Sequence, residues 1–247
     1  MTLSIDLVLT IWMAVAVASA LRAFTGFGFA LAAVPIFTWV LPPSLAVVLS
    51  ASLVFATSSL RFGVFKQSLP KRKLTGLILA LIVFSSVGVV FLSSLDRSRF
   101  QLLAGIMLLS ASALLVFSSR FSFSGGRFKD LFTGSAAGLL NGLLSMPGPP
   151  LIVYVLATEK DPAQGRALLM TLLLASAALA LVNFGWMGFV TLDSLWLFLL
   201  AWPVMLLGDH LGNRWFAKYG SKQYRRVAIS VLVLIALSSI ASGIGQL

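Results

Sequence analysis

The stretch ALRAFTGFGFALAAVPIF, residues 20–37, is almost entirely apolar, yet it contains an arginine, two glycines and a proline. Its apolar side chains predict a segment buried in a lipid bilayer. Arg22 is costly in that setting, and Gly26, Gly28 and Pro35 interrupt a regular helix. Non-helical backbone at membrane depth is tolerated only where protein or a water-filled cavity satisfies its polar groups. We therefore expect this break to lie at a polar site inside the membrane.

The whole chain has the composition of a membrane protein. Of its 247 residues, 59% are hydrophobic and 10% are charged, and the mean hydropathy is +1.03, whereas a soluble domain has about 25% charged residues. The apolar residues form long runs without strict alternation, which predicts an all-α integral membrane protein. The predicted segments are 7–40, 44–65, 74–93, 100–118, 131–157, 166–187, 193–211 and 227–244.

No known catalytic pattern is present. The sequence contains no G-x-S-x-G, Walker or H-E-x-x-H motif and no cysteine, and its polar connections are too short to form a second core. We expect no enzyme activity, no cofactor and no metal site. The net charge of +11 comes from basic residues in loops between apolar segments, so we expect them to face anionic lipid and not nucleic acid.

The first and fifth segments are longer than a membrane requires, and both are interrupted. The interruptions are TGFGFA at 25–30 and SMPGPP at 145–150. A shift of 119 positions aligns 21–37 with 140–156 without gaps. This predicts two repeats in the membrane, 1–119 and 131–247, joined by a polar cytoplasmic linker at 120–130.

The distribution of charge predicts how the repeats are oriented. If the first and fifth segments are re-entrant hairpins, fifteen of the eighteen Lys and Arg residues lie in loops on one side, namely 61–73, 118–130, 158–166 and 212–226. Basic loops favour the cytoplasm. We therefore expect two inverted repeats, each a re-entrant or broken helical hairpin plus three transmembrane helices, with both termini outside the cytoplasm. A broken helix that crosses the membrane fully is the alternative.

The hairpin tips are the candidate substrate site. Each returning limb starts at a break, so a helix N-terminus points into the membrane interior, and such a terminus attracts anions. Arg22 would bind an anion through paired hydrogen bonds. The further candidate residues are Gly26 and Gly28 in the first break, Asn141, Ser145 and Gly148 in the second, and Arg166 at the start of the sixth segment.

Each of these residues also has a purely structural interpretation. The glycines and prolines could serve tight turns or close helix packing, and Arg22 could pair with a carbonyl or an unidentified acid. Arg166 could gate or attract an anion, but it could equally be a charge that sets the membrane topology and extends to the interface. Asp209 and His210 form an acid–histidine pair near the cytoplasmic end of the seventh segment, where His210 could relay a proton but is interpreted as an interfacial residue. With no acid expected in the middle of a segment, coupling to sodium or protons through a carboxylate is not favoured.

The order of these motifs resembles the TauE/SafE sulfite-exporter family over about residues 8–244. The family pattern is roughly G-x-G-G-G-x-x-x-x-P. The first copy here, GFGFALAAVP at 26–35, has Phe29 and Ala30 at glycine positions. The second copy, SMPGPPLIVY at 145–154, keeps Gly148 but departs at Ser145, Pro147 and Tyr154. These departures bear on the substrate, because the residues would line the site.

The resemblance implies a multi-pass protein of the bacterial inner membrane that exports small anions. Sulfite, sulfonates and related organosulfur compounds are the expected substrates, with a carboxylate as a further option. The substrate, the direction of transport, any coupling ion and the oligomeric state, including a homodimer, stay open. The alternatives are an uptake channel for the same anions and a membrane assembly or sensor subunit that transports nothing.

Overall fold

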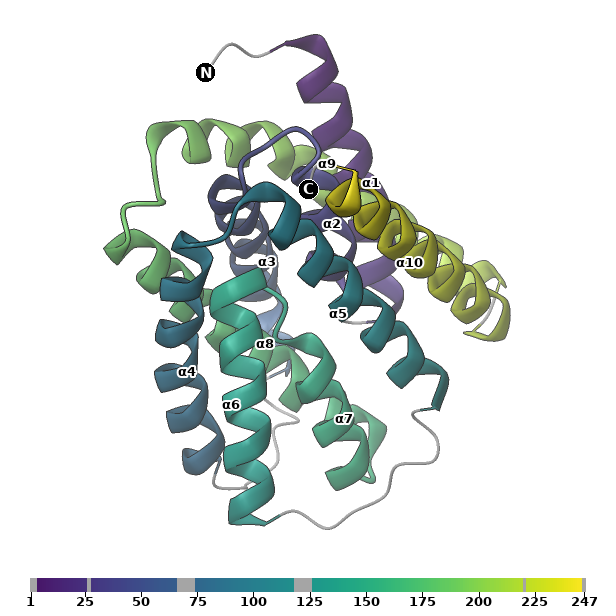
Figure 1. Ribbon diagram of the computed structural model, residues 1–247. Coiled ribbons are helices and arrows are strands. Elements are labelled where there is room, and N and C mark those ends of the chain that lie inside the picture. The colour runs from purple at the N-terminus through teal and green to yellow at the C-terminus, as the bar shows by residue number, and fades with distance from the viewer. Residues whose placement is uncertain (1–3, 26–27, 66–73, 118–125, 220, 246–247) are drawn as a thin grey trace.

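Figure 1 shows the computed structural model of the chain, which describes residues 4–25, 28–65, 74–117, 126–219 and 221–245. Within these ranges every regular element is a helix, which confirms the all-α prediction. The helices are α1 Ile5–Thr25, α2 Phe29–Phe37, α3 Pro43–Phe65, α4 Thr75–Ser93, α5 Arg97–Phe117, α6 Arg127–Leu144, α7 Gly148–Thr158, α8 Pro162–Trp186, α9 Leu192–Tyr219 and α10 Ser221–Ile244.

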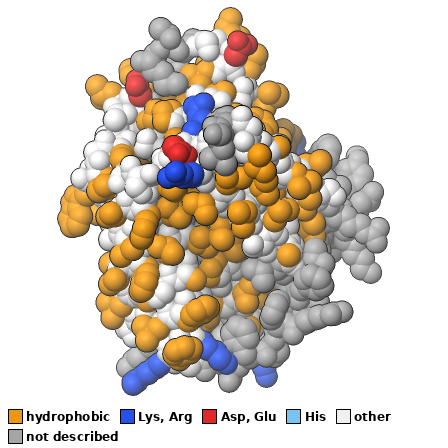
Figure 2. All heavy atoms as spheres, in the orientation of Figure 1, with side chains coloured by type: hydrophobic (Ala, Val, Ile, Leu, Met, Phe, Trp, Pro, Cys, Tyr) orange, Lys and Arg blue, Asp and Glu red, His pale blue; other side chains and the backbone are white. Residues whose placement is uncertain are grey.

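Five described helices are long and apolar enough to cross a membrane. The candidate spans are Ile5–Arg22, Pro43–Gly63, Thr75–Ser93, Ala163–Trp186 and Leu192–Gly212. Apolar side chains cover much of the face in Figure 2, and most Lys and Arg side chains on that face gather at its lower edge, where Figure 1 places the start of α6. The chain is therefore a multi-pass membrane protein.

Each of the two interrupted segments forms a pair of helices with unequal limbs. In the first pair, α1 has 21 residues and α2 has 9, or about 31 Å and 14 Å at 1.5 Å per residue. In the second pair, α6 has 18 residues and α7 has 11. Figure 1 shows α7 running back from the break toward the end at which α6 begins, and α2 packs on α1.

This geometry refines the expected hairpins. A re-entrant hairpin with two short limbs does not fit α1, which is long enough to span a hydrocarbon core of about 30 Å. The break follows residue 25, so α1 has its full length, whereas α2, the helix that turns back, has only 9 residues. The second pair also starts earlier than expected, because α6 begins at Arg127 and takes up the last residues of the predicted linker.

A seam of glycines holds α4 against α6. Gly134, Gly138 and Gly142 recur every four residues and so share one face of α6. A Cβ atom at Gly138 would come within 2.6 Å of the Leu81 carbonyl oxygen, and one at Gly142 would overlap the Ser85 carbonyl oxygen. Small residues at this spacing let two backbones approach closely in a membrane. The stretch GSAAGLLNG, 134–142, carried this signal, which our sequence analysis missed.

The two halves of the chain interlock. The first half's α4 packs on the second half's α6, and in the same way the second half's α9 packs on the first half's α1; α3 packs on α8, and α5 packs on α10. Gly208 of α9 lies against Ser19 of α1 at a contact too close for a Cβ atom. This interlocking brings the two helix breaks together.

Candidate functional site

The first break has a charged residue on one side and a helix N-terminus on the other. Arg22 lies in the last turn of α1, where the helix dipole favours a positive charge. Gly28 precedes α2 with φ 97°, a left-handed conformation that glycine adopts without steric cost. The break is therefore determined by local sequence. Gly26 lies outside the described residues.

The second break is a left-handed helix cap followed by prolines. Ser145 has φ 57°; its N–H donates to the Asn141 carbonyl at 2.9 Å, and the Met146 N–H donates to the Leu140 carbonyl at 3.2 Å. The first of these is the 5→1 bond of an αL helix cap, which closes α6. Helix α7 then starts at Gly148, with prolines in its first turn, where a missing N–H does no harm.

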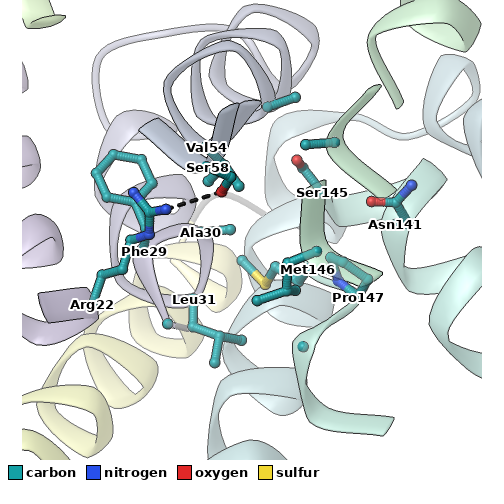
Figure 3. A pocket seen from close by; sticks show the side chains of 15 residues that line it. Arg22, Phe29, Ala30, Leu31, Val54, Ser58, Asn141, Ser145, Met146 and Pro147 are labelled. Atoms are coloured by element: carbon teal, nitrogen blue, oxygen red, sulfur yellow. Dashed lines mark hydrogen bonds between the residues drawn. The ribbon is translucent and has the colours of Figure 1, made fainter. Parts of the chain in front are cut away.

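Both breaks line one small pocket. Its volume is about 40 Å³, enough for roughly three water-sized groups. Figure 3 shows Arg22 and Phe29 on one side, and Ser145, Asn141 and Pro147 on the other. The pocket is lined by Arg22, Gly28, Phe29, Ala30, Leu31, Ala51, Val54, Ser58, Asn141, Ser145, Met146, Pro147, Gly148, Leu173 and Ala177.

Arg22 supplies the charge of this pocket. The residue is only 5% exposed, and its Nη2 donates to Ser58 Oγ at 3.0 Å, as Figure 3 shows. Its Nη1 makes no hydrogen bond to any described residue. The Asp209 Oδ2 atom is 3.8 Å from Nη1, which is longer than a hydrogen bond. The guanidinium therefore borders the pocket and keeps one donor, Nη1 on the side of Asp209, that makes no hydrogen bond to a described residue.

The backbone of α2 adds further donors. The Ala32 N–H bonds to the Gly28 carbonyl at 3.2 Å, so the three N–H groups before it, at residues 29–31, have no partner within the helix. Those three residues line the pocket. In contrast, Pro147, Pro149 and Pro150 at the start of α7 have no N–H group. The donors are therefore concentrated at the first break.

Asn141 presents an acceptor. Its Nδ2 donates to Ser85 Oγ at 3.1 Å and to the Ser176 carbonyl at 2.9 Å, which uses both of its N–H bonds. The bond to a carbonyl fixes the orientation of the amide, because an oxygen in that place would be repelled. In Figure 3 the amide oxygen points toward the pocket and the nitrogen points away from it.

The predicted site residues fall into three groups. Arg22, Gly28, Asn141, Ser145 and Gly148 line the common pocket. Arg166 is exposed in the first turns of α8 and is not among the residues that line it. Gly26 falls on the part of the chain that is not described.

Asp209, which the sequence places near the end of the seventh segment without a role, lies buried beside two arginines. Asp209 is only 3% exposed, and its Oδ2 lies 3.8 Å from Arg22 and 3.3 Å from Arg61. Its position inside the apolar span Leu192–Gly212 was the available signal, since an ionisable residue in a span is functional by default. His210, the next residue, is exposed as expected. The described residues contain no cluster of three His, Asp or Glu side chains suited to a metal.

Comparison with known proteins identifies relatives of the chain. The family model described as "Sulfite exporter TauE/SafE" matches residues 11–239. A protein of Cupriavidus necator described as a probable sulfite/organosulfonate exporter TauE is 29% identical over 164 residues, which cover 65% of this chain and 63% of that protein. The matched region thus spans less than two thirds of the curated relative. No solved structure matches the chain.

Proposed function

Because the chain belongs to the sulfite exporter TauE/SafE family, we propose that it is a secondary transporter that exports small sulfur-containing anions. The name of its relative from C. necator indicates sulfite or an organosulfonate. Arg22, the candidate anion-binding charge, is the last residue of a candidate membrane span and borders a pocket formed by two helix breaks. The membrane concerned is the bacterial inner membrane.

The single observation that carries this proposal is the state of Arg22. Arg22 is buried, borders the pocket and has an Nη1 without a hydrogen bond, a costly state unless something else completes its bonds. An oxyanion accepts from a guanidinium through short, charge-assisted bonds. The backbone N–H groups at the start of α2 would add to the same anion site.

The size and polarity of the pocket support a small substrate with two different ends. A volume of about 40 Å³ suits an anion the size of sulfite better than a long organosulfonate or a bulky carboxylate. One end of the pocket offers the donors of Arg22 and α2, while the other offers the Asn141 oxygen as an acceptor. A monoanion that keeps one proton, such as hydrogen sulfite, satisfies both ends.

The packing supports two equivalent repeats, and the charge distribution favours their inversion. If α1–α5 is exchanged with α6–α10, the contact of α4 with α6 becomes that of α9 with α1, and the contacts of α3 with α8 and α5 with α10 are unchanged. A pseudo-two-fold axis produces this pattern. We therefore keep the repeats at 1–119 and 131–247, joined through 120–130, as the two units that move in alternating access.

The membrane potential favours export. An anion that leaves a cell with a negative interior gains about 2.3 kcal/mol per charge for each 100 mV. No coupling ion is required for that direction. A homodimer remains part of the proposal, to be tested by the mass of the detergent-solubilised protein.

The test of this function is anion flux into proteoliposomes under an imposed membrane potential. Sulfite, sulfoacetate, acetate and chloride are compared for the wild type, Arg22→Gln and Arg22→Lys. We expect sulfite to move fastest, Arg22→Gln to reduce its flux at least tenfold, and Arg22→Lys to retain part of it, because lysine keeps the charge but loses the paired geometry.

The matched control is Arg99→Gln, which removes an arginine whose side chain is 65% exposed and which is not among the residues that line the pocket. It should transport like the wild type. If no anion moves, the transport proposal is wrong and an assembly or sensor role becomes the better hypothesis. If Arg22→Gln transports normally, the site assignment is wrong.

A further inference from the structure

Asp209 is the one buried acid found among the described residues, and it joins two arginines. Its Oδ2 lies 3.8 Å from Nη1 of Arg22 and 3.3 Å from Nη2 of Arg61. The three side chains come from α9, α1 and α3 and carry a net charge of +1. Arg61 differs from the other two because it is partly open to the surface, with 34% of its side chain exposed.

These three residues separate two cavities. Arg22 borders the buried pocket, whereas Arg61 and Asp209 line a surface hollow of about 220 Å³. Helix α3 contributes to both, since Ser58 lines the pocket and its neighbour Thr57 lines the hollow. The hollow is at the end of α3 that leads into the basic segment 61–73, which the charge distribution places toward the cytoplasm.

We propose that Asp209 is an internal counter-ion that the transported anion replaces on Arg22, so that Arg61, Asp209 and Arg22 form an entrance gate between the hollow and the pocket. The inference rests on the proposed function, in which Arg22 binds the anion. Arg61 meets the anion in the hollow, and Arg22 receives it in the pocket.

The distances support this exchange. The contact between Arg22 and Asp209 is longer than a hydrogen bond, so an oxyanion that bonds to Nη1 directly forms a shorter and stronger interaction. Asp209 then keeps its closer contact with Arg61. The exchange leaves no carboxylate buried without a positive partner, which would be the costly state.

The gate predicts that both KM and kcat fall for Asp209→Asn. Without its competitor, Arg22 binds the anion more tightly, and KM for sulfite should fall about tenfold, equivalent to about 1.4 kcal/mol. Release from the pocket should slow, because no carboxylate returns to displace the anion, and kcat should fall as well. Arg61→Gln should raise KM, because Asp209 loses its second partner and holds Arg22 more strongly.

The control is Asp96→Asn, the same chemical change in an exposed ion pair. Asp96 accepts from the Arg99 N–H at 2.8 Å at the start of α5, and asparagine retains this helix cap. Its KM and kcat should match those of the wild type. Asp209→Glu is the second variant in case Asp209→Asn fails to fold. It keeps the negative charge and its side chain is one bond longer. Its carboxylate should therefore compete more strongly with the anion for Arg22 and raise KM.

The experiment measures sulfite flux against concentration, per mole of folded protein, in proteoliposomes. A lower KM together with a lower kcat in Asp209→Asn, or a raised KM in Asp209→Glu if the first variant does not fold, supports the gate. An unchanged KM in whichever variant folds overturns it, as does a raised KM in Asp209→Asn. A wild type that moves no anion, or an Arg22→Gln variant that transports normally, instead identifies a failure of the proposed function itself.

Discussion

At the scale of single residues, the chemistry of the pocket depends on which hydrogen-bond donors and acceptors its polar side chains have not used. Arg22 keeps one donor without a hydrogen bond, whereas Asn141 has used both of its N–H bonds on Ser85 and the Ser176 carbonyl. The two positions, which the proposed repeats would relate, thus differ in chemistry: Arg22 presents positive charge and Asn141 an uncharged acceptor. An anion held between them is recognised at each end by different chemistry.

Asn141→Asp should abolish sulfite transport in folded protein. The substitution puts a negative charge in the pocket, and opposing like charges cost several kcal/mol, so we expect flux to fall more than about tenfold. The measurement is flux per mole of folded protein in the same vesicle assay.

Asn183→Asp is the matched variant. Asn183 is also buried and donates to Ser85 Oγ, at 3.2 Å, but it is not among the residues that line the pocket. It should lower stability without removing transport. Equal losses of flux in both variants would contradict the role of Asn141 in the pocket.

At the scale of elements, close packing of α4 on α6 fixes the second break in place. The glycine seam brings the two backbones together and thereby sets Ser85 within hydrogen-bond distance of Asn141. A second tether lies at the other end of α6, where the Tyr154 hydroxyl of α7 donates to Asp130 at 2.6 Å. The position of the Asn141 amide is therefore a consequence of helix packing.

Gly142→Ala should destabilise the protein. Its Cβ would overlap the Ser85 carbonyl oxygen, and overpacking of this kind costs about 1–3 kcal/mol. We expect a clear fall in the melting temperature of the detergent-solubilised protein.

Gly63→Ala provides the comparison for that measurement. Gly63 lies in α3, is exposed, and would place its Cβ in open space. Alanine there should leave stability unchanged or raise it by up to about 1 kcal/mol, from its better helix propensity. A melting temperature for Gly142→Ala as high as that of Gly63→Ala would show that the seam is looser than the structure indicates.

At the scale of the whole molecule, the interlocked halves and the one-sided basic charge belong to a single topological proposal. The short connection at residues 94–96 joins α4 and α5, and α5 then runs 21 residues toward the connection before α6. If α5 crosses the membrane, Ser94 and Gly126 lie on opposite sides. The charge distribution places Gly126 in the cytoplasm.

Single cysteines test this topology without background, because the chain contains none. Ser94→Cys and Gly126→Cys both alter exposed residues. We expect a membrane-impermeant maleimide to label Ser94→Cys in intact cells, and Gly126→Cys only after the membrane is opened. Labelling of both from the same side would refute the proposed arrangement of the repeats.

The sequence by itself determined the features that depend on local chemistry. The eight apolar segments correspond to the observed helices, because the length of an apolar run and its flanking residues are local properties. Both helix breaks were found for the same reason, since glycine and proline interrupt a helix wherever it packs. Arg22 stood out because a charge in an apolar run is visible without a structure.

Only the tertiary structure decided which groups meet. Asp209 is 187 positions from Arg22 in the sequence, and no periodicity or motif predicts that their helices cross at that point. The orientation of the Asn141 amide depends on partners from α4 and α8. The same is true of Arg166, whose place outside the pocket follows from the packing of α8. Local sequence fixes where a helix starts and breaks, whereas the bonds left open for a ligand depend on contacts between distant helices.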